Sequence, residues 1–295
     1  MRMREYLGFL LISMLVLGVS AFSQDEKKEE EPKYGWSKQV VGNLNFTQSS
    51  FDNWSQGGED SWAWLLGFNA RVENDQVKTN WRNIGKVEYG QSKVGDASSR
   101  KSADEIFLES VLSYKMKFHV NPYIAVNGRT QIASGYAYAI DASNQEIRTE
   151  ISKFLNPGYF MESVGFEYRK EETFRSRLGF ALKQTLVTEE QFAPLYTDEI
   201  DTQKLEKIRN EAGLESVSAY NRKITPTIVY ATSLEVFSNM KAFDQIDTRW
   251  DNLISAEVAK YVAVSFAFQI FYDRDLSIKR QLKQVLAVGL TYNFL

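Results

Sequence analysis

Cysteine is absent from the 295-residue chain, and histidine occurs once, as His119. Without thiols the chain forms no disulfide framework, and a single imidazole is too few for a zinc centre. His119 stands alone in a short link between two expected strands, so we interpret it as a turn residue rather than a general base. The sequence has no G-x-S-x-G motif and no phosphate-binding glycine loop. We therefore expect no enzymatic activity, no cofactor and no metal.

Long apolar runs are almost absent as well. The mainly apolar stretch Leu7–Val19 follows Arg2 and Arg4, and it is shorter than the roughly twenty residues that a spanning helix needs. Ala21-Phe22-Ser23 then supplies small residues at the two positions that a signal peptidase reads. This pattern predicts a cleaved signal peptide over residues 1–23 and therefore an exported protein.

Net charge is also low, at −3 with a sequence pI of about 5.5. This balance gives no electrostatic reason to expect nucleic acid as a partner. The charges are concentrated in places, however, and residues 24–35 begin with the run Q-D-E-K-K-E-E-E-P-K. We expect these residues to be a flexible periplasmic lead-in to a single folded domain over residues 36–295.

Alternation of apolar and small or polar residues dominates the end of the chain. Over residues 262–272, valine, phenylalanine, isoleucine and tyrosine share one parity, and residues 285–294 repeat the pattern. A period of two over about ten residues indicates a β-strand with one apolar face, and such a length suits a tilted strand that crosses a bilayer. The last expected strand closes on an aromatic residue near its end, Phe294, which is typical of outer-membrane barrels.

The same alternation recurs along the whole domain and predicts about twelve strands. They cover residues 36–49, 61–73, 78–91, 106–116, 123–134, 158–169, 174–183, 212–221, 225–239, 247–259, 262–272 and 285–295. Glu162 falls on an apolar parity and suggests a bulge or an inward turn. Residues 135–156 are expected to be a loop, and residues 198–210 have helical spacing. Aromatic residues gather at expected strand ends, as membrane-interface girdles do: Trp36, Trp62, Trp81, Tyr123, Tyr159, Trp250, Tyr261, Tyr272 and Tyr292.

The fold class that follows is all-β: a transmembrane antiparallel β-barrel of about twelve strands in the outer membrane. Long and short connections alternate, which indicates short periplasmic turns and longer extracellular loops. A soluble β-sandwich is the alternative, but sandwich strands are typically about five or six residues long. Outer-membrane lipid is thus an expected partner.

One segment resembles a known family. Residues 51–61 read F-D-N-W-S-Q-G-G-E-D-S, and the core formed by Asn53, Trp54, Gly57 and Gly58 resembles the amino-terminal hallmark of the DUF3078 family. The segments W-D-N-L-I-S, Y-D-R-D and V-G-L-T-Y-N-F further along are similar to that family too. The resemblance implies an outer-membrane barrel of a Bacteroidota bacterium and supplies no catalytic residue. Read from the residues alone, this outer-loop motif is either a tight turn or a contact for a ligand or partner.

Charged residues on the inward parity are the main candidates for function. Burying charge in a narrow tube is costly unless the charges pair or the tube holds water. The expected lumen-facing set consists of Arg71, Arg82, Lys86, Arg129, Arg175, Arg177, Lys183, Glu73, Glu88, Glu109, Glu235 and Glu257.

Two interpretations of this inner face stay open. The acids and bases either cross-link into a sealed structural barrel, or they line a narrow passive channel for small solutes, with Arg129, Arg175 and Arg177 favouring anions. A barrel that docks another envelope protein through its outer loops is the alternative. The loop carboxylates Asp141, Glu146, Asp198, Glu199 and Asp201 are read as a solvated surface rather than a cation site.

Overall fold

A computed structural model describes residues 34–52, 55–56, 58–116, 119–143, 145–170, 173–197, 205–273 and 279–294. The chain divides into two compact units, residues 1–33 and 34–295, and the first lies entirely outside the described residues. The predicted signal peptide and nearly all of the lead-in fall there. All the elements below belong to the second unit.

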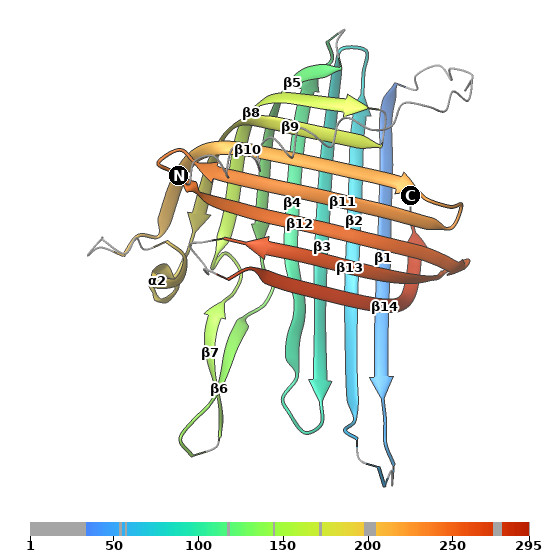
Figure 1. Cartoon of the computed structure of the whole chain (residues 1–295), viewed down its shortest axis with the longest axis vertical. Helices are drawn as coiled ribbons and strands as arrows, with labels where there is room; N and C mark the ends of the chain where they lie inside the picture. The colour runs from blue at the N-terminus through green and yellow to red at the C-terminus, as the bar shows by residue number, and fades with distance from the viewer. Residues whose placement is uncertain are drawn as a thin grey trace, which may run out of the picture. The chain divides into compact units, whose positions relative to one another are not determined.

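Twelve antiparallel strands close into a barrel (Figure 1), in the order β1-β14-β13-β12-β11-β10-β9-β8-β5-β4-β3-β2 and back to β1. This confirms the predicted fold class. The strands are β1 (Gly35–Ser49), β2 (Ser61–Asp75), β3 (Thr79–Val94), β4 (Arg100–Tyr114), β5 (Val120–Thr130), β8 (Gly158–Lys170), β9 (Phe174–Leu186), β10 (Ile208–Lys223), β11 (Ile228–Asn239), β12 (Ala242–Ala259), β13 (Val262–Tyr272) and β14 (Gln281–Asn293).

The alternation in the sequence places one parity of each strand outside and the other inside. On β14, for example, Leu286, Val288 and Leu290 are exposed while Ala287 between them is buried. A band of exposed large apolar side chains recurs on strand after strand, which is the face that an outer-membrane barrel presents to lipid. No helix among the described residues is long and apolar enough to cross a membrane.

The barrel has two different rims. At the turn rim β1 begins, β14 ends, and short links such as residues 76–78 and 260–261 connect neighbouring strands. At the loop rim lie the longer connections 50–60, 131–157 and 187–207. The alternation is not strict, because β12 begins at Ala242 and leaves only Met240 and Lys241 as a tight loop-rim link.

The expected loop over residues 135–156 holds a separate two-stranded hairpin of β6 (Gly135–Ile140) and β7 (Glu146–Ser152). That expectation was wrong because β6 is short and its pattern of tyrosine and alanine is weak. The hairpin projects from the barrel (Figure 1). A second loop contains η2 (Glu190–Phe192) and α2 (Ala193–Tyr196). Tyr196 donates to the carbonyl of Ile151 at 2.7 Å, and burial raises the pKa of its hydroxyl.

Two further local predictions were wrong. Residues 208–210 are not helical but open β10, since pairing with β9 fixes them as strand; residues 198–204 lie outside the described part. Glu162 causes no bulge, because β8 pairs with both neighbours without a register shift and leaves this carboxylate exposed on the outward face.

Most aromatic residues of the predicted girdles are exposed on the outside. Trp36 and Trp81 pack edge to face at 5.8 Å between ring centroids near the turn rim, and Tyr261 contacts Tyr292 at 6.0 Å. Tyr123 and Tyr159 do not belong to the girdles. Tyr123 lies on the inward parity with only 3% exposure, and Tyr159 lines an interior cavity.

Candidate functional site

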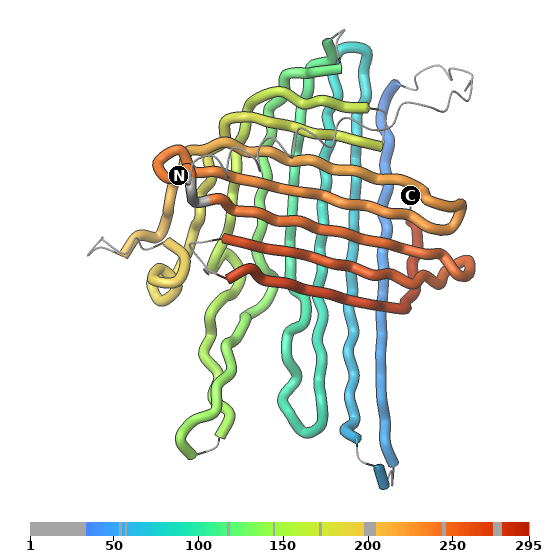
Figure 2. The backbone as a smooth tube through the Cα atoms, in the orientation of Figure 1, coloured from blue at the N-terminus to red at the C-terminus, as the bar shows by residue number. Residues whose placement is uncertain are grey.

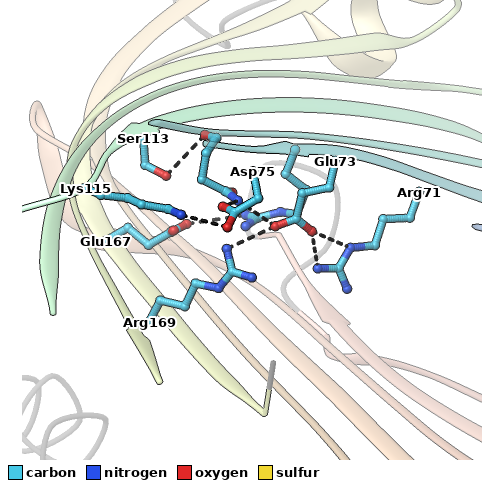
Figure 3. Close-up of polar contacts among 9 residues, drawn as sticks. Arg71, Glu73, Asp75, Ser113, Lys115, Glu167 and Arg169 are labelled. Atoms are coloured by element: carbon cyan, nitrogen blue, oxygen red, sulfur yellow. Dashed lines mark hydrogen bonds and ion pairs between the residues drawn. The ribbon is translucent and has the colours of Figure 1, made fainter. Parts of the chain in front are cut away.

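The lumen near the turn rim holds a compact cluster of acids and bases (Figure 3). Glu73 on β2 accepts from Arg71 Nε at 3.1 Å, from Asn80 Nδ2 at 2.7 Å and from Arg169 at 3.0 Å. Asp75, two residues further along β2, pairs with Lys115 at 2.7 Å. Because Arg169 comes from β8, four strands away round the barrel, this cluster joins separate parts of the wall.

Deeper in the lumen the ion pairs are almost fully buried. Arg82 on β3 pairs with Glu167 on β8 at 3.4 Å, and their side chains are 5% and 2% exposed. Arg177 on β9 lies between Glu109 of β4 at 2.7 Å and Glu215 of β10 at 2.9 Å. Charges this deeply buried are tolerated only with such partners, since desolvating an unpaired ion costs several kcal/mol.

A third cluster spans the barrel from one side to the other. Glu105 on β4 accepts from Arg249 on β12 at 2.8 Å, and it forms ion pairs with Arg129 on β5 at 3.2 Å and with Lys86 on β3 at 3.0 Å. Strands β4 and β12 are six positions apart in either direction round the twelve-stranded ring. The Glu105–Arg249 pair therefore links opposite walls across the lumen.

The outer members of this cluster are paired as well. Arg129 also reaches Glu235 on β11 at 3.4 Å, Arg249 reaches Asp251 at 2.9 Å, and Lys86 reaches Glu88 at 3.2 Å. The side chains of Arg129 and Glu235 are 22% and 34% exposed, in contrast to those around Arg177. This cluster thus borders open space rather than packed protein.

Lys183 forms the last cluster, towards the loop rim. Its ammonium pairs with Asp247, lies 3.6 Å from Glu211 and 3.8 Å from Asp273, and stands over the ring of Phe237 at 5.5 Å. Lys183 comes from β9 and Asp247 from β12, three strands round the ring. Ion pairs across the lumen therefore continue up to the loop rim.

An interior cavity of about 450 Å³ lies among these last two clusters. Its lining comes from β4, β5 and β8 and, continuing round the ring, from β9 to β14. The cavity is bordered by charged side chains such as Glu105, Arg249 and Lys183 and by aromatic rings such as Phe237 and Phe271. Its size falls in the range that holds a small organic ligand.

All twelve predicted lumen charges lie on the inward parity of their strands, Glu257 included, which shares the parity of Arg249 and Asp251 on β12. Arg175 shares the inward face with Arg177 and lies opposite Arg169 in the register. Glu257 differs, since it is exposed near the turn rim next to an irregularity in the β12–β13 pairing, and no ion pair is described for it.

Several members of the network were missed by sequence reasoning, although a signal for them exists. Acids and bases recur two residues apart on the inward parity, as in Glu167-x-Arg169 and Asp247-x-Arg249-x-Asp251. Such neighbours lie on the same face of a strand. The residues missed are Asp75, Lys115, Glu105, Glu167, Arg169, Arg209, Glu211, Glu215, Asp247, Arg249, Asp251 and Asp273.

The outer-loop motif is only partly described, because Asn53, Trp54 and Gly57 lie outside the described residues. Gly58 adopts φ of +150°, and a Cβ placed there would approach the Phe51 ring to 2.8 Å. The Phe51 amide donates to Asp60 at 2.7 Å. These contacts are those of a tightly folded turn, and the choice between turn and contact site stays a prediction.

The loop carboxylates form no metal site within the described part of the chain, where no group of three or more histidine, cysteine or acidic residues is suitably placed. Asp141 accepts from the backbone amides of Ser143 and Gln145 at 2.9 and 2.7 Å, and Glu146 pairs with Arg100. Asp198, Glu199 and Asp201 lie outside the described residues.

The fold and the paired lumen define the class of this protein as a closed twelve-stranded β-barrel with a charged interior. A family model described as "Protein of unknown function (DUF3078)" matches residues 46–136, a range that includes the outer-loop motif, and so supports the resemblance to that family. No curated protein matches the chain.

Similar solved structures include bacterial barrels of low sequence identity. The translocator domain of autotransporter NalP from Neisseria meningitidis has 6% identity and a TM-score of 0.38, covering 98% of this chain and 95% of that one. An outer-membrane channel from Pseudomonas putida F1 has 14% identity and a TM-score of 0.37, covering 92% and 99%. The CymD monoaromatic hydrocarbon channel has 10% identity and a TM-score of 0.33, covering 89% of each chain. At these values the likenesses carry no argument about function.

Proposed function

We propose that this protein is an outer-membrane β-barrel that provides a narrow, normally closed passage for small solutes. It is exported by its signal peptide, belongs to a Bacteroidota-type bacterium, and performs no catalysis. The turn rim faces the periplasm and the loop rim faces outward, as short turns and long loops do in bacterial barrels. The exposed apolar band and the resemblance to the DUF3078 family support the location.

The pair between Glu105 and Arg249 carries the proposal. It joins opposite walls at 2.8 Å, so a solute passes only when this pair separates. The pair is accessible to water, with exposures of 13% and 15%, and its members have other partners to turn to. Separation is therefore less costly here than at a fully buried pair, which suits a gate.

Two of the three arginines expected to favour anions, Arg129 and Arg177, bear on the solute preference that we propose. Arg177 lies between two carboxylates, and Arg129 also contacts two. Their charge is neutralised within the wall, so neither presents a free cation to a passing solute. A passage that does not favour strongly charged solutes fits the paired lumen better.

Planar-bilayer recording of the refolded chain from Gln24 to Leu295 tests the proposal. We expect rare, small openings for the natural sequence and frequent openings for Glu105→Gln, because the neutral amide no longer holds Arg249 across the lumen. Glu257→Gln is the matched control, since Glu257 is exposed with no described ion pair, and it should behave like the natural sequence. A silent Glu105→Gln barrel that is folded would instead favour a sealed structural role.

Docking of another envelope protein remains the second candidate, and one observation favours it. The β6–β7 hairpin projects from the barrel and exposes Ile140 and Ile147 at 65% and 48%. Exposed apolar side chains on a projecting element are typical of a contact surface. Removing both by Ile140→Ser and Ile147→Ser should then abolish recovery of a partner while leaving the conductance unchanged.

A further inference from the structure

The seam that closes the barrel is much shorter than the other strand pairings. β1 pairs with β2 along its whole length from Gly35 to Ser49, but with β14 only through residues 41–45 opposite 289–293. Within the described residues, the stretch Gln281–Val288 of β14 pairs on one side only, with β13. In Figures 1 and 2 this stretch forms the edge of the front layer of strands before the chain turns up beside β1.

At the end of this edge β14 comes into close contact with β1. Gly289 passes so close to β1 that a Cβ on it would lie 2.5 Å from the carbonyl oxygen of Leu44. Only glycine permits such an approach of two backbones. Beyond this point the two strands part, and pairing stops.

The unpaired edge lies at the depth of the apolar band. Leu282, Leu286 and Val288 point outward from it with exposures of 54%, 72% and 55%, and Phe46 on the facing part of β1 is 57% exposed. Free backbone N–H and C=O groups are costly in hydrocarbon, so a barrel normally pairs such an edge throughout. An edge left unpaired at this depth is therefore a place where the wall opens.

This edge also borders the interior cavity, because Gln281, Leu282 and Lys283 contribute to the cavity lining. The carboxylates of the lining have cationic partners, such as Glu105 with Arg249 and Asp247 with Lys183. Lys283 has no described ion pair and is exposed at the edge. Aromatic and apolar side chains supply much of the remaining lining: Tyr159, Phe160, Met161, Phe237 and Phe271.

We propose that the parting of β1 and β14 is a lateral portal through which small uncharged amphipathic molecules, an aromatic ring bearing a hydroxyl group for example, pass between the lipid layer and the cavity. The inference rests on the proposed solute passage and names its substrate class and its route. The aromatic rings of the cavity lining pack against the apolar part of the solute, and polar groups of the lining form hydrogen bonds with its hydroxyl group. A charged molecule is disfavoured because the buried charges are already paired.

The absence of cysteine allows a clean test by cross-linking. Continuing the β1–β14 register places Gln48 opposite Leu286, so Gln48→Cys with Leu286→Cys should close the portal when oxidised or bridged by a short bis-maleimide. Leu44→Cys with Leu290→Cys is the matched control, because those residues already lie opposite each other in the paired part. The probe is 4-fluorobenzyl alcohol. Its binding to the full barrel in lipid nanodiscs, and its rate of entry, are measured by fluorine NMR exchange.

We expect the alcohol to bind to the natural barrel and its charged analogues 4-fluorobenzoate and 4-fluorobenzylammonium to bind at least about tenfold more weakly, or about 1.4 kcal/mol. Closing the portal should slow entry of the alcohol about tenfold or more, equivalent to about 1.4 kcal/mol on the barrier. The control cross-link should leave the rate unchanged.

Each of three other outcomes would contradict a particular part of this inference. If the Gln48–Leu286 cross-link leaves the rate of alcohol entry unchanged, the portal is contradicted. The proposed passage then stands, since the alcohol enters at the loop rim. Equal binding of the charged analogues contradicts the substrate class. No binding of the alcohol contradicts the inference as a whole, and the Glu105→Gln conductance decides independently whether the proposed function survives.

Discussion

Two regions of the lumen contain arginine–glutamate ion pairs that differ in how far they are exposed. Around Arg177 and Glu215 the side chains are each 4% exposed, and every charge is held by close neighbours. Around Glu105 and Arg129 the exposures rise to 13% and 22%. The comparison teaches that pairing alone does not fix the role of a charge in a barrel. Buried ion pairs, here called dry, cost much free energy to break because each ion is left without water. Partly exposed ion pairs, here called wet, separate at lower cost because water replaces the partner.

The dry region should give the largest effect on stability. Arg177→Met leaves Glu109 and Glu215 buried without their cation, and we expect a loss of about 3–5 kcal/mol in the free energy of unfolding. Urea unfolding of the barrel in micelles, followed by tryptophan fluorescence, measures this. Adding Glu109→Gln and Glu215→Gln to the same chain should recover much of the loss. An Arg177→Met barrel as stable as the natural one would show that these pairs are not dry.

The wet region should give a smaller effect in the same measurement. Glu105→Gln removes one carboxylate shared by three cations, but those cations keep Glu88, Glu235 and Asp251 and reach water. We expect a loss of about 1–2 kcal/mol, close to that of a hydrogen bond to a charged group. A loss equal to that of Arg177→Met would abolish the distinction between the two regions.

The smallest effect is expected outside the lumen. Arg100 and Glu146 form an ion pair between β4 and the β6–β7 hairpin, with side-chain exposures of 45% and 32%. Glu146→Gln should change the free energy of unfolding by about 0–1 kcal/mol, because exposed pairs are screened by water and salt. The free energy of unfolding should be measured at low and high salt. A larger loss for Glu146→Gln would show that exposure to water does not determine the order of stability losses among the three variants.

The sequence predicts the barrel well for a physical reason. A strand that separates lipid from lumen alternates apolar with polar residues, so Val262–Tyr272 and most other strands are visible without a structure. The inward parity likewise predicts that Arg82, Arg177 and Lys183 face the lumen. Glu162 and Tyr123 mislead because a single residue against the pattern has several explanations, and the register decides among them.

What the sequence does not contain is the pairing across the lumen. Glu105 and Arg249 lie on strands that are far apart in the chain and on opposite sides of the ring, and no local spacing connects them. The short β1–β14 seam is hidden for the same reason, because residues 285–293 alternate like those of any paired strand whether or not β1 pairs with them. Closure of a sheet is a property of all strands together.

The most direct test of the account compares three barrels in a planar bilayer with a salt gradient: Glu105→Gln, Arg249→Met and the double variant. If the pair across the lumen holds the passage closed, all three open more often than the natural barrel. The first should favour anions because it has excess positive charge, the second should favour cations, and the double variant should favour neither. Three silent but folded barrels, or one selectivity shared by all three, would contradict the claim that Glu105 and Arg249 form the gate.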